Sequence, residues 1–310
     1  MRRQPQTSVP QELVVRVLDV GQGDATFISN GSSKIIIDGG PSPAVFGRYL
    51  DSLSLNNTTI DVVVLSHQHL DHYSGLRELF RTSRHIRVRY FFENKDPAAA
   101  VTLSILRDSI LARMDHDSLV YRDTDDPCSN GRQICTITMA GGARAHILAP
   151  RPVGGSANNR STAVKLIGPD SASFTMWLAG DAEHQEIDWF DDTGYDEDPG
   201  MRVSVLKADH HGSCSGVTMH YLDLIQPQWV IASVGARNDY GHMHSQAKRL
   251  YRSARLPWYR TDRNGSVTIR SRGIPQGGFT ITPDRPGTDL GGAGDRVSPQ
   301  RACSRRSMER

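Results

Sequence analysis

The sequence predicts an α/β protein in which strands and helices alternate along most of the chain. Short apolar runs rich in Val, Ile and Leu recur between polar turns, as buried strands do. Between several of these runs, apolar residues recur at helical spacing, for example over residues 43–55 and 103–114. The expected strands lie at residues 13–20, 34–37, 62–65, 88–92, two within 134–148, 163–167, 174–178, 203–208, 229–234 and 266–269. This alternation, without any repeat of fixed period, favours a single α/β domain.

The composition divides the chain into three parts. Residues 1–12 lack periodicity and are expected to form a flexible leader, whereas residues 13–270 hold all the expected strands and helices. Beyond residue 270, Pro, Gly, Ser and Arg dominate, so residues 271–310 are expected to be a disordered basic tail. The whole chain of 310 residues, with 37% apolar and 23% charged residues, has an ordinary globular balance.

Composition and charge say little about partners. The net charge of +2 is too close to zero to indicate a nucleic-acid binder by itself. No apolar run approaches the length of a membrane span, so we expect no membrane partner and a cytoplasmic location. The four cysteines, at positions 128, 135, 214 and 303, include no Cys-x-x-Cys pair. Unpaired thiols are therefore expected, with Cys214 filling space rather than binding a metal.

The densest cluster of metal-binding side chains directly follows one strand. After residues 62–65 the chain reads Ser66-His67-Gln68-His69-Leu70-Asp71-His72. His67 and His69, two apart in extended backbone, project on the same side and can bind one ion, while Asp71 and His72 can bind a second. Imidazole and carboxylate ligands suit zinc first, and also manganese or iron. The cluster predicts two divalent transition metals, the alternative being a surface histidine cluster without metal.

Three more strands end in residues of the same kind. Residues 34–37 lead into Asp38, residues 174–178 into Ala179-Gly180-Asp181, and residues 203–208 into Asp209-His210-His211. Asp38 is expected to orient a metal-bound histidine, the alternative being an ordinary turn residue. Asp181 repeats the layout of the first cluster, although an aspartate there would also suit the cap of a following helix.

Taken in order, these motifs resemble a known family. His67-x-His69-x-Asp71-His72 is similar to the metal-binding signature of the metallo-β-lactamase superfamily, a spacing that specifies the superfamily but not the substrate. Additional motifs narrow the resemblance to the hydrolase domain of ComEC-type DNA-uptake proteins and their stand-alone soluble relatives. The motifs lie at residues 19–25, 37–40, 66–75, 178–181, 209–213, 240–242 and 259–262.

The resemblance implies a fold and a ligand set. The fold is a metallo-β-lactamase-like four-layer αβ/βα sandwich with the metals at one edge of its two sheets. The implied metal ligands are His67, His69, Asp71, His72, Asp181 and His210. Asp181 would bridge the two metals, and His210 is preferred over His211 because it matches a His-x-Gly-Ser/Thr pattern. Lactamase-like members carry a further histidine where this chain has Asn158-Asn159, and Asn159 is expected behind the ligands.

The chemistry implied is that of a metal-dependent hydrolase. Two metals sharing Asp181 would supply a metal-activated hydroxide without a protein nucleophile. Asp71 is expected to take part in catalysis as well as in metal binding, and His242 or His211 to protonate the leaving group.

Three further residues, Asn238, Tyr240 and Ser213, are expected to bind substrate. A phosphodiester is the favoured substrate, either nucleic acid or a smaller molecule. A hydrolase of a small ester, lactone or β-lactam and a non-enzymatic interaction module are the alternatives.

Overall fold

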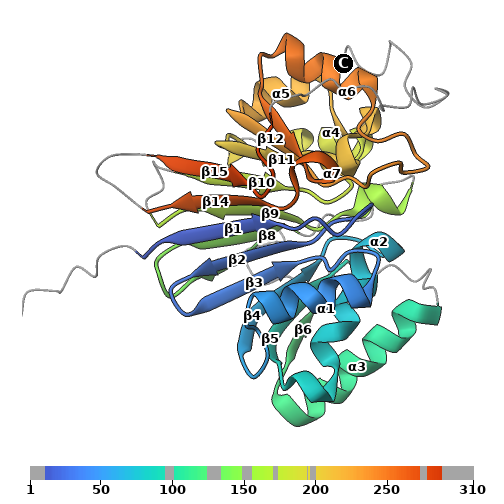
Figure 1. Cartoon of the computed structure of the whole chain (residues 1–310), viewed down its shortest axis with the longest axis vertical. Helices are drawn as coiled ribbons and strands as arrows, with labels where there is room; N and C mark the ends of the chain where they lie inside the picture. The colour runs from blue at the N-terminus through green and yellow to red at the C-terminus, as the bar shows by residue number, and fades with distance from the viewer. Residues whose placement is uncertain are drawn as a thin grey trace, which may run out of the picture.

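Two β-sheets packed face to face form the centre of the fold (Figure 1). The computed structural model describes residues 11–94, 101–123, 134–148, 156–169, 174–193, 195, 200–272 and 278–287. The first sheet has the order β15-β14-β1-β2-β3-β4-β5-β6, and the second has the order β13-β12-β11-β10-β9-β8-β7. The strands of the first sheet are β1 (Leu13–Val17), β2 (Thr26–Asn30), β3 (Ser33–Ile37), β4 (Thr59–Leu65), β5 (Arg87–Glu93), β6 (Val120–Arg122), β14 (Val267–Ser271) and β15 (Phe279–Pro283). Those of the second are β7 (Ile134–Thr138), β8 (Arg144–Leu148), β9 (Ala163–Ile167), β10 (Thr175–Leu178), β11 (Val205–Lys207), β12 (Trp229–Ala232) and β13 (Trp258–Arg260).

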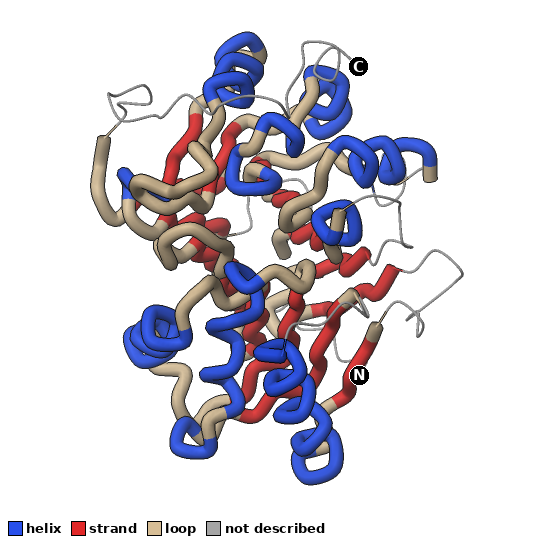
Figure 2. The backbone as a smooth tube through the Cα atoms, turned by 90° about the vertical axis from the view of Figure 1, so that its right-hand side faces the viewer, coloured by secondary structure: helices blue, strands red, loops and turns tan. Residues whose placement is uncertain are grey.

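Helices cover the outer face of each sheet. The first sheet carries α1 (Pro43–Ser52), α3 (Val101–Asp117) and the 3₁₀ helix Ser74–Phe80, which follows α2 (Leu70–Tyr73). The second sheet carries α4 (His184–Asp192), α5 (Met219–Ile225) and α6 (Ser245–Ser253), while α7 (Thr261–Asn264) follows β13. Figure 2 shows the strands lying between the helices of the two halves. The result is the expected four-layer αβ/βα sandwich.

β4 shows how its sequence specifies this layering. Val62 and Val64 point into the core between the two sheets, whereas Val63 and Leu65 pack against the helices outside. Because both faces of the second half of β4 are buried, residues 62–65 form a continuous apolar run rather than an alternating one. Full burial of each such side chain contributes roughly 1.5–3 kcal/mol.

Parallel pairing brings the future site residues to one place. β3, β4, β5 and β6 are parallel to one another, and so are β10, β11, β12 and β13. Neighbouring parallel strands end at the same edge of a sheet, so the loops that leave β3 and β4 lie together, as do those that leave β10, β11 and β12. Open α/β sheets bind ligands outside such strand ends.

The fold extends past the boundary expected at residue 270. β15 pairs antiparallel with β14, from Val267 opposite Pro283 to Ser271 opposite Phe279. Phe279 and Ile281 pack against the core between the sheets, so this segment belongs to the sheet. The expectation of a disordered tail came from the average composition of residues 271–310, and that average concealed the short strand β15. The expected leader and the rest of the expected tail fall mostly on residues 1–10, 273–277 and 288–310, which lie outside the described residues.

Two further expectations bear on the chain as a whole. Cys135 and Cys214 each take part in a disulfide, which corrects the expectation of unpaired thiols. Spacing along the sequence could not reveal this, because pairing depends on which cysteines the fold brings together. Within the described residues, every helix is too short or too polar to cross a membrane.

Candidate metal centre

The candidate site lies where the carboxyl ends of parallel strands from both sheets meet. β4 leads into residues 66–72, β10 into Gly180 and Asp181, and β11 into the 3₁₀ turn Asp209–Gly212. Together with the loop after β12, these segments surround a pocket of about 480 Å³. The pocket is lined by Gln22, His69, Leu70, Asp71, Asn158, Asp181, His210, His211, Tyr240 and His242.

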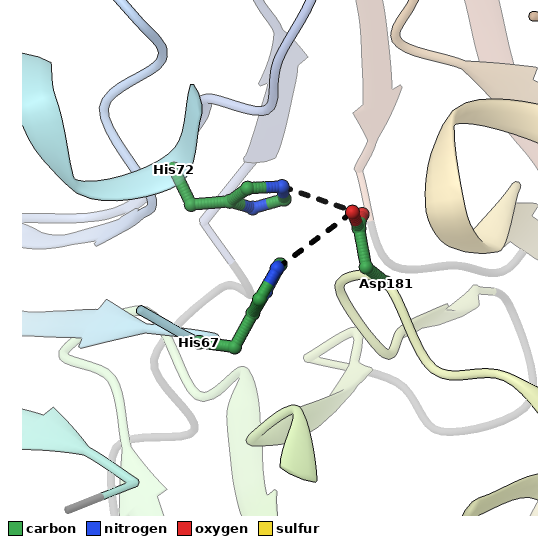
Figure 3. A group of neighbouring side chains, drawn as sticks. All are labelled: His67, His72 and Asp181. Atoms are coloured by element: carbon green, nitrogen blue, oxygen red, sulfur yellow. Dashed lines mark ion pairs between the residues drawn. The ribbon is translucent and has the colours of Figure 1, made fainter. Parts of the chain in front are cut away.

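One group of ligand atoms joins the first sheet to the second. His67 and His72 both point at the carboxylate of Asp181 (Figure 3). Nε2 of His72 lies 3.3 Å from Oδ1 of Asp181, and Nε2 of His67 lies 3.7 Å from Oδ2. All three side chains are buried, and the three atoms are close enough together to share one ion.

A second group shares members with the first. Nε2 of His211 lies 3.3 Å from Oδ2 of Asp71 and 3.4 Å from Oδ2 of Asp181. Nε2 of His72 is 4.0 Å from the same oxygen of Asp71. Asp71, His72 and His211 thus form another set of three ligand atoms that could hold a metal.

The hydrogen bonding of these atoms tests whether a metal fits. Nε2 of His67, His72 and His211 and Oδ1 of Asp181 are all buried without a hydrogen-bond partner among the described residues. A buried polar atom left unpaired costs roughly 1–3 kcal/mol. Four such atoms facing one another are therefore best explained by a cation that accepts their lone pairs, and imidazole with carboxylate is a donor set for divalent transition metals.

The electrostatics of the site differ between the carboxylates and the histidines. Burial raises the pKa of Asp181, but the charges of His211, His72 and His210 outweigh it and hold that pKa well below its usual value. The pKa of Asp71 is lowered in the same way. Burial raises it, but the charges of His72 and His211 lower it by more. Burial lowers the pKa of His67 well below its ordinary value. At neutral pH the two carboxylates are therefore ionised and His67 is neutral, as metal ligands must be. Burial lowers the pKa values of His72 and His211, but Asp181 and the neighbouring carboxylates outweigh it and raise both well above the ordinary value, so a metal would have to displace a proton from each ring.

Asp38 lies directly behind His72. Its Oδ2 accepts from Nδ1 of His72 at 2.9 Å and from Oγ of Ser66 at 2.7 Å, while Oδ1 accepts from the Ser66 backbone N–H at 2.8 Å. Because an ionised carboxylate can only accept, Nδ1 of His72 carries a proton, so a neutral His72 would turn its Nε2 lone pair toward Asp181. Asp38 has φ +58°, a left-handed conformation that turns its carboxylate back under the loop.

Asp24 holds the corresponding position behind His211, which sequence reasoning missed. Its Oδ1 lies 3.3 Å from Nδ1 of His211, which also donates to the Ser233 carbonyl at 3.0 Å. Oδ2 of Asp24 accepts from Nζ of Lys207 at 2.7 Å, and both side chains are buried. Gly23 lets this loop approach the metal loop, since a Cβ there would meet the Asp71 carbonyl oxygen at 2.3 Å. The sequence signal that could have pointed to a buried acidic partner is Lys207, a charged residue at the end of an otherwise apolar strand.

The paired histidines go to different places. His210 and His211 have φ values of +46° and +56°, and the turn points only His211 into the group formed with Asp71 and Asp181. His210 lines the rim, with Nδ1 3.1 Å from Oε1 of Glu183 and Nε2 3.7 Å from Asp181. His69 is exposed at the pocket, and its ring centre lies 4.6 Å from that of His67.

Of the three residues expected to bind substrate, only Tyr240 lines the metal pocket. Tyr240 is 63% exposed and stacks on His242, with ring centres 5.6 Å apart. Asn238 instead uses its side chain inside its own loop, because it accepts from the His242 backbone N–H at 2.9 Å and donates to the Gly235 and His242 carbonyls. Ser213 is buried and accepts from the backbone N–H of Ser215, outside the pocket lining. Neither of these two side chains is placed to hold substrate in the metal pocket.

The two asparagines before β9 also differ. Oδ1 of Asn159 accepts from the Glu186 backbone N–H at 3.2 Å, so this side chain serves the first turn of α4 rather than the ligands. Asn158 lines the pocket, and its Nδ2 lies 3.5 Å from the ring of His210. Asn158 therefore lies nearer to the ligand groups than Asn159 does.

His242 has a defined tautomer. Oε1 of Gln22 accepts from the Gly235 backbone N–H, so its amide group donates to Nδ1 of His242 at 3.3 Å. The His242 proton is then on Nε2. Burial, together with the charges of His211, His210 and His244, lowers the pKa of His242 to about 2, so the ring is neutral at neutral pH.

We predict that the buried Lys207–Asp24 pair stabilises the fold more than an exposed pair of similar length. Lys207→Met leaves the Asp24 carboxylate buried without its cation, which should lower the free energy of unfolding by about 3–5 kcal/mol. The control is Arg89→Met, which removes an exposed pair with Asp61 at 2.9 Å and should cost about 1 kcal/mol or less. Urea denaturation measures both. Equal losses would contradict the argument, whereas adding Asp24→Asn to Lys207→Met should recover part of the loss.

Comparisons with known proteins agree with the motifs. Residues 18–157 match the model of the metallo-beta-lactamase superfamily. The chain is 27% identical over 148 residues to ComE operon protein 3 of Bacillus subtilis, which covers 47% of this chain and 18% of that protein. It is 26% identical over 246 residues to Recombination protein 2 of Haemophilus influenzae, covering 77% of this chain and 26% of that protein. The chain thus spans about a fifth to a quarter of the length of these two relatives.

A similar solved structure is that of Igni18, a metallo hydrolase from Ignicoccus hospitalis, with a TM-score of 0.48 and 14% identity over 82% of this chain and 98% of that one. Competence protein ComA of Neisseria gonorrhoeae is 22% identical over 290 residues, covering 88% of this chain and 34% of that protein. The family model and these relatives confirm the resemblance drawn from the motifs. The matched segment contains the whole histidine–aspartate motif at residues 67–72, so this part of the chain is similar to the metallo-beta-lactamase superfamily.

Proposed function

We propose that the protein is a metal-dependent phosphodiesterase acting on nucleic acid or on a smaller phosphodiester. One observation carries the hydrolytic part of this proposal. Buried, unpaired ligand atoms of His67, His72, His211 and Asp181 converge beside an open pocket of about 480 Å³. That arrangement suits a metal centre with access for a substrate, rather than a closed structural metal site.

We assign the metal ligands from these positions. His72, His211 and Asp71 would hold one divalent metal, and His67 with His69 another, with Asp181 near both. His211 replaces His210 as the favoured ligand, since the Nε2 of His211 faces two carboxylates while His210 pairs with Glu183 at the rim. Zinc is the favoured metal for such donors, with manganese or iron as alternatives.

When bound, the metals supply Lewis acidity, which activates water and stabilises negative charge on substrate oxygens. The chain itself offers no competing nucleophile there, since Ser, Thr and Cys are absent from the described residues lining the pocket. His242 is neutral and carries its proton on Nε2, so it would donate a hydrogen bond to a substrate oxygen rather than a proton to the leaving group. His210, paired with Glu183 at the rim, is the better candidate for proton transfer.

The choice of a phosphodiester rests on the relatives and on one asparagine. The relatives include proteins named for competence and for recombination, processes in which nucleic acid is the molecule handled. Asn158 lines the pocket in the region where lactamase-like members carry another histidine, which argues against a β-lactam substrate.

A substrate panel tests this function directly. We expect the purified protein, loaded with zinc or manganese, to hydrolyse bis-p-nitrophenyl phosphate and single-stranded DNA but not nitrocefin. Activity should disappear on chelation and return on adding metal back. Turnover of nitrocefin or of small esters alone would replace the proposal by its lactam or ester alternative. Inactivity on every substrate with full metal loading would favour an interaction module.

We predict that His211→Ala weakens metal binding more than His210→Ala. The first variant removes a proposed ligand, so metal affinity should fall by more than the roughly 10–100-fold typical of residues that only orient a ligand. The second should change affinity by less than about tenfold. Competition with a chromophoric chelator measures both without requiring activity. The reverse order would restore His210 as the ligand.

Asp181→Ala should cost more activity than Asp38→Asn. Asp181 faces both ligand groups, whereas Asp38 acts through His72 and should lose roughly 10–100-fold. Rates of bis-p-nitrophenyl phosphate hydrolysis at saturating metal provide the comparison. Equal losses at the two positions would show that their roles have been misassigned.

A further inference from the structure

Two exposed apolar side chains lie at the metal pocket. Seven large apolar or aromatic side chains are exposed among the described residues, and five of them belong to β5 and α3. The other two, Leu70 and Tyr240, both line the metal pocket. Leu70 begins α2 after β4, and Tyr240 belongs to the loop after β12, so they come from different sheets. Single exposed apolar residues are common, but two at one polar pocket indicate an apolar group to be bound there.

The ring of Tyr240 is held in place on one face. It stacks on His242 with the ring centres 5.6 Å apart and the planes 22° apart. Other imidazoles pack around His242 in turn, with the ring centre of His244 at 4.7 Å and that of His210 at 5.2 Å. Nε2 of His244 also donates to the Tyr240 carbonyl at 3.1 Å. Tyr240 is therefore fixed by its backbone and by one ring contact, while 63% of it remains exposed.

The rest of the pocket lining suits a phosphate and metals but offers little to an apolar group. The other eight lining residues carry imidazole, carboxylate or amide groups, namely Gln22, His69, Asp71, Asn158, Asp181, His210, His211 and His242. The pocket volume of about 480 Å³ lies in the range of sites that hold one small molecule, roughly 300–1,000 Å³. A nucleobase that enters such a pocket must first leave its pairing partner. Once unpaired, it stacks on aromatic side chains whatever its identity.

We propose that Tyr240 stacks on a nucleobase next to the scissile phosphodiester, and that Leu70 contacts the same nucleotide from the side of the first sheet. The proposal rests on the proposed function and specifies its substrate as one with an unpaired nucleobase beside the cleaved bond. The ring of Tyr240, and not its hydroxyl, carries the recognition. Stacking accepts every base, so the pocket selects an unpaired nucleotide without reading its sequence.

Abasic dinucleotides test the proposal. The substrates are thymidylyl-thymidine and its two analogues in which a tetrahydrofuran group replaces one nucleoside, so that one base is missing. For the unaltered, metal-loaded protein, one analogue should have a KM roughly tenfold higher than that of thymidylyl-thymidine, because it lacks the stacked base. In Tyr240→Ala this KM ratio should fall to near one. A tenfold ratio that persists in Tyr240→Ala, or a ratio of one for both analogues in the unaltered protein, would overturn the proposal.

Two further variants separate the ring from the hydroxyl and test the second side chain. Tyr240→Phe keeps the ring and should therefore keep the tenfold ratio, whereas a ratio near one would assign the recognition to the hydroxyl and contradict stacking. Leu70→Ala should lower the ratio by less than Tyr240→Ala does, since an aliphatic side chain contacts a base without an aromatic face. An unchanged ratio would remove Leu70 from the site.

The control variant is Tyr90→Ala. Tyr90 is exposed and stacked as well, with its ring centre 6.4 Å from that of Phe92 and the planes 26° apart, but it does not line the metal pocket. Its KM ratio should match that of the unaltered protein. A fall as large as that in Tyr240→Ala would show that the ratio reports the loss of any exposed aromatic residue, and the proposal would fail.

A fluorescence titration separates this proposal from the proposed function, because it does not require hydrolysis. The probes are the two dinucleotides in which 2-aminopurine replaces one thymine, since the fluorescence of this base falls when it stacks on an aromatic ring. If the protein hydrolyses no dinucleotide but quenches one probe, and Tyr240→Ala does not, the stacking site stands and the phosphodiesterase function fails. If hydrolysis occurs without quenching and without a KM ratio, the function stands and the stacking site is wrong. Neither hydrolysis nor quenching would overturn both.

Discussion

Imidazole nitrogens buried face to face with carboxylates impose the constraint on which the rest of this site depends. Nε2 of His72 or His211 can face the pocket with its lone pair only if Nδ1 is held by an acceptor on the other side. Asp38 is that acceptor for His72, and the Ser233 carbonyl is the acceptor for His211, with Oδ1 of Asp24 3.3 Å from the same nitrogen. Each ligand thus brings a second buried polar group with it.

Those buried carboxylates need partners in turn. Ser66 gives Asp38 two hydrogen bonds, and Lys207 gives Asp24 a full cation. A buried charge without compensation costs several kcal/mol, so the partners follow from the ligands and not the reverse. Each buried polar group behind the metal position therefore needs a hydrogen-bond partner of its own. The series ends at backbone carbonyls, such as that of Ala208, which accepts from Nζ of Lys207 at 3.0 Å.

The same constraint joins the two halves of the sandwich. His72 and Asp71 follow a strand of the first sheet, whereas Asp181 and His211 follow strands of the second. The Asp24–Lys207 pair crosses the same boundary, from the loop between β1 and β2 to β11. A buried ion pair adds little net stability over a well-packed apolar pair. Its effect here is on specificity, because it is satisfied only when the sheets are docked in one register.

Much of this arrangement is predictable from the sequence, because the strongest signals are local. The run of residues 62–65 followed by the histidines at 67, 69 and 72 reveals a strand and its loop, and the strand before Asp181 repeats that layout. What local patterns omit is the direction of each side chain. Asn238 is a plausible substrate ligand in sequence, yet its amide is used within its own loop. Asp24 and Lys207 are 183 residues apart, so their pairing is invisible until the sheets are packed.

The paired histidines show why residue type alone could not decide between two adjacent candidates. Two consecutive residues with positive φ reverse the chain tightly after Asp209, and each such conformation costs a non-glycine residue roughly 1–2 kcal/mol. The turn separates the imidazoles, with His211 directed at Asp71 and Asp181 and His210 at Glu183. An ordinary extended backbone would also separate neighbouring side chains, but it would carry the chain away from the pocket. The strained turn keeps both histidines at the same pocket, so one short segment provides a buried ligand and a histidine at the rim.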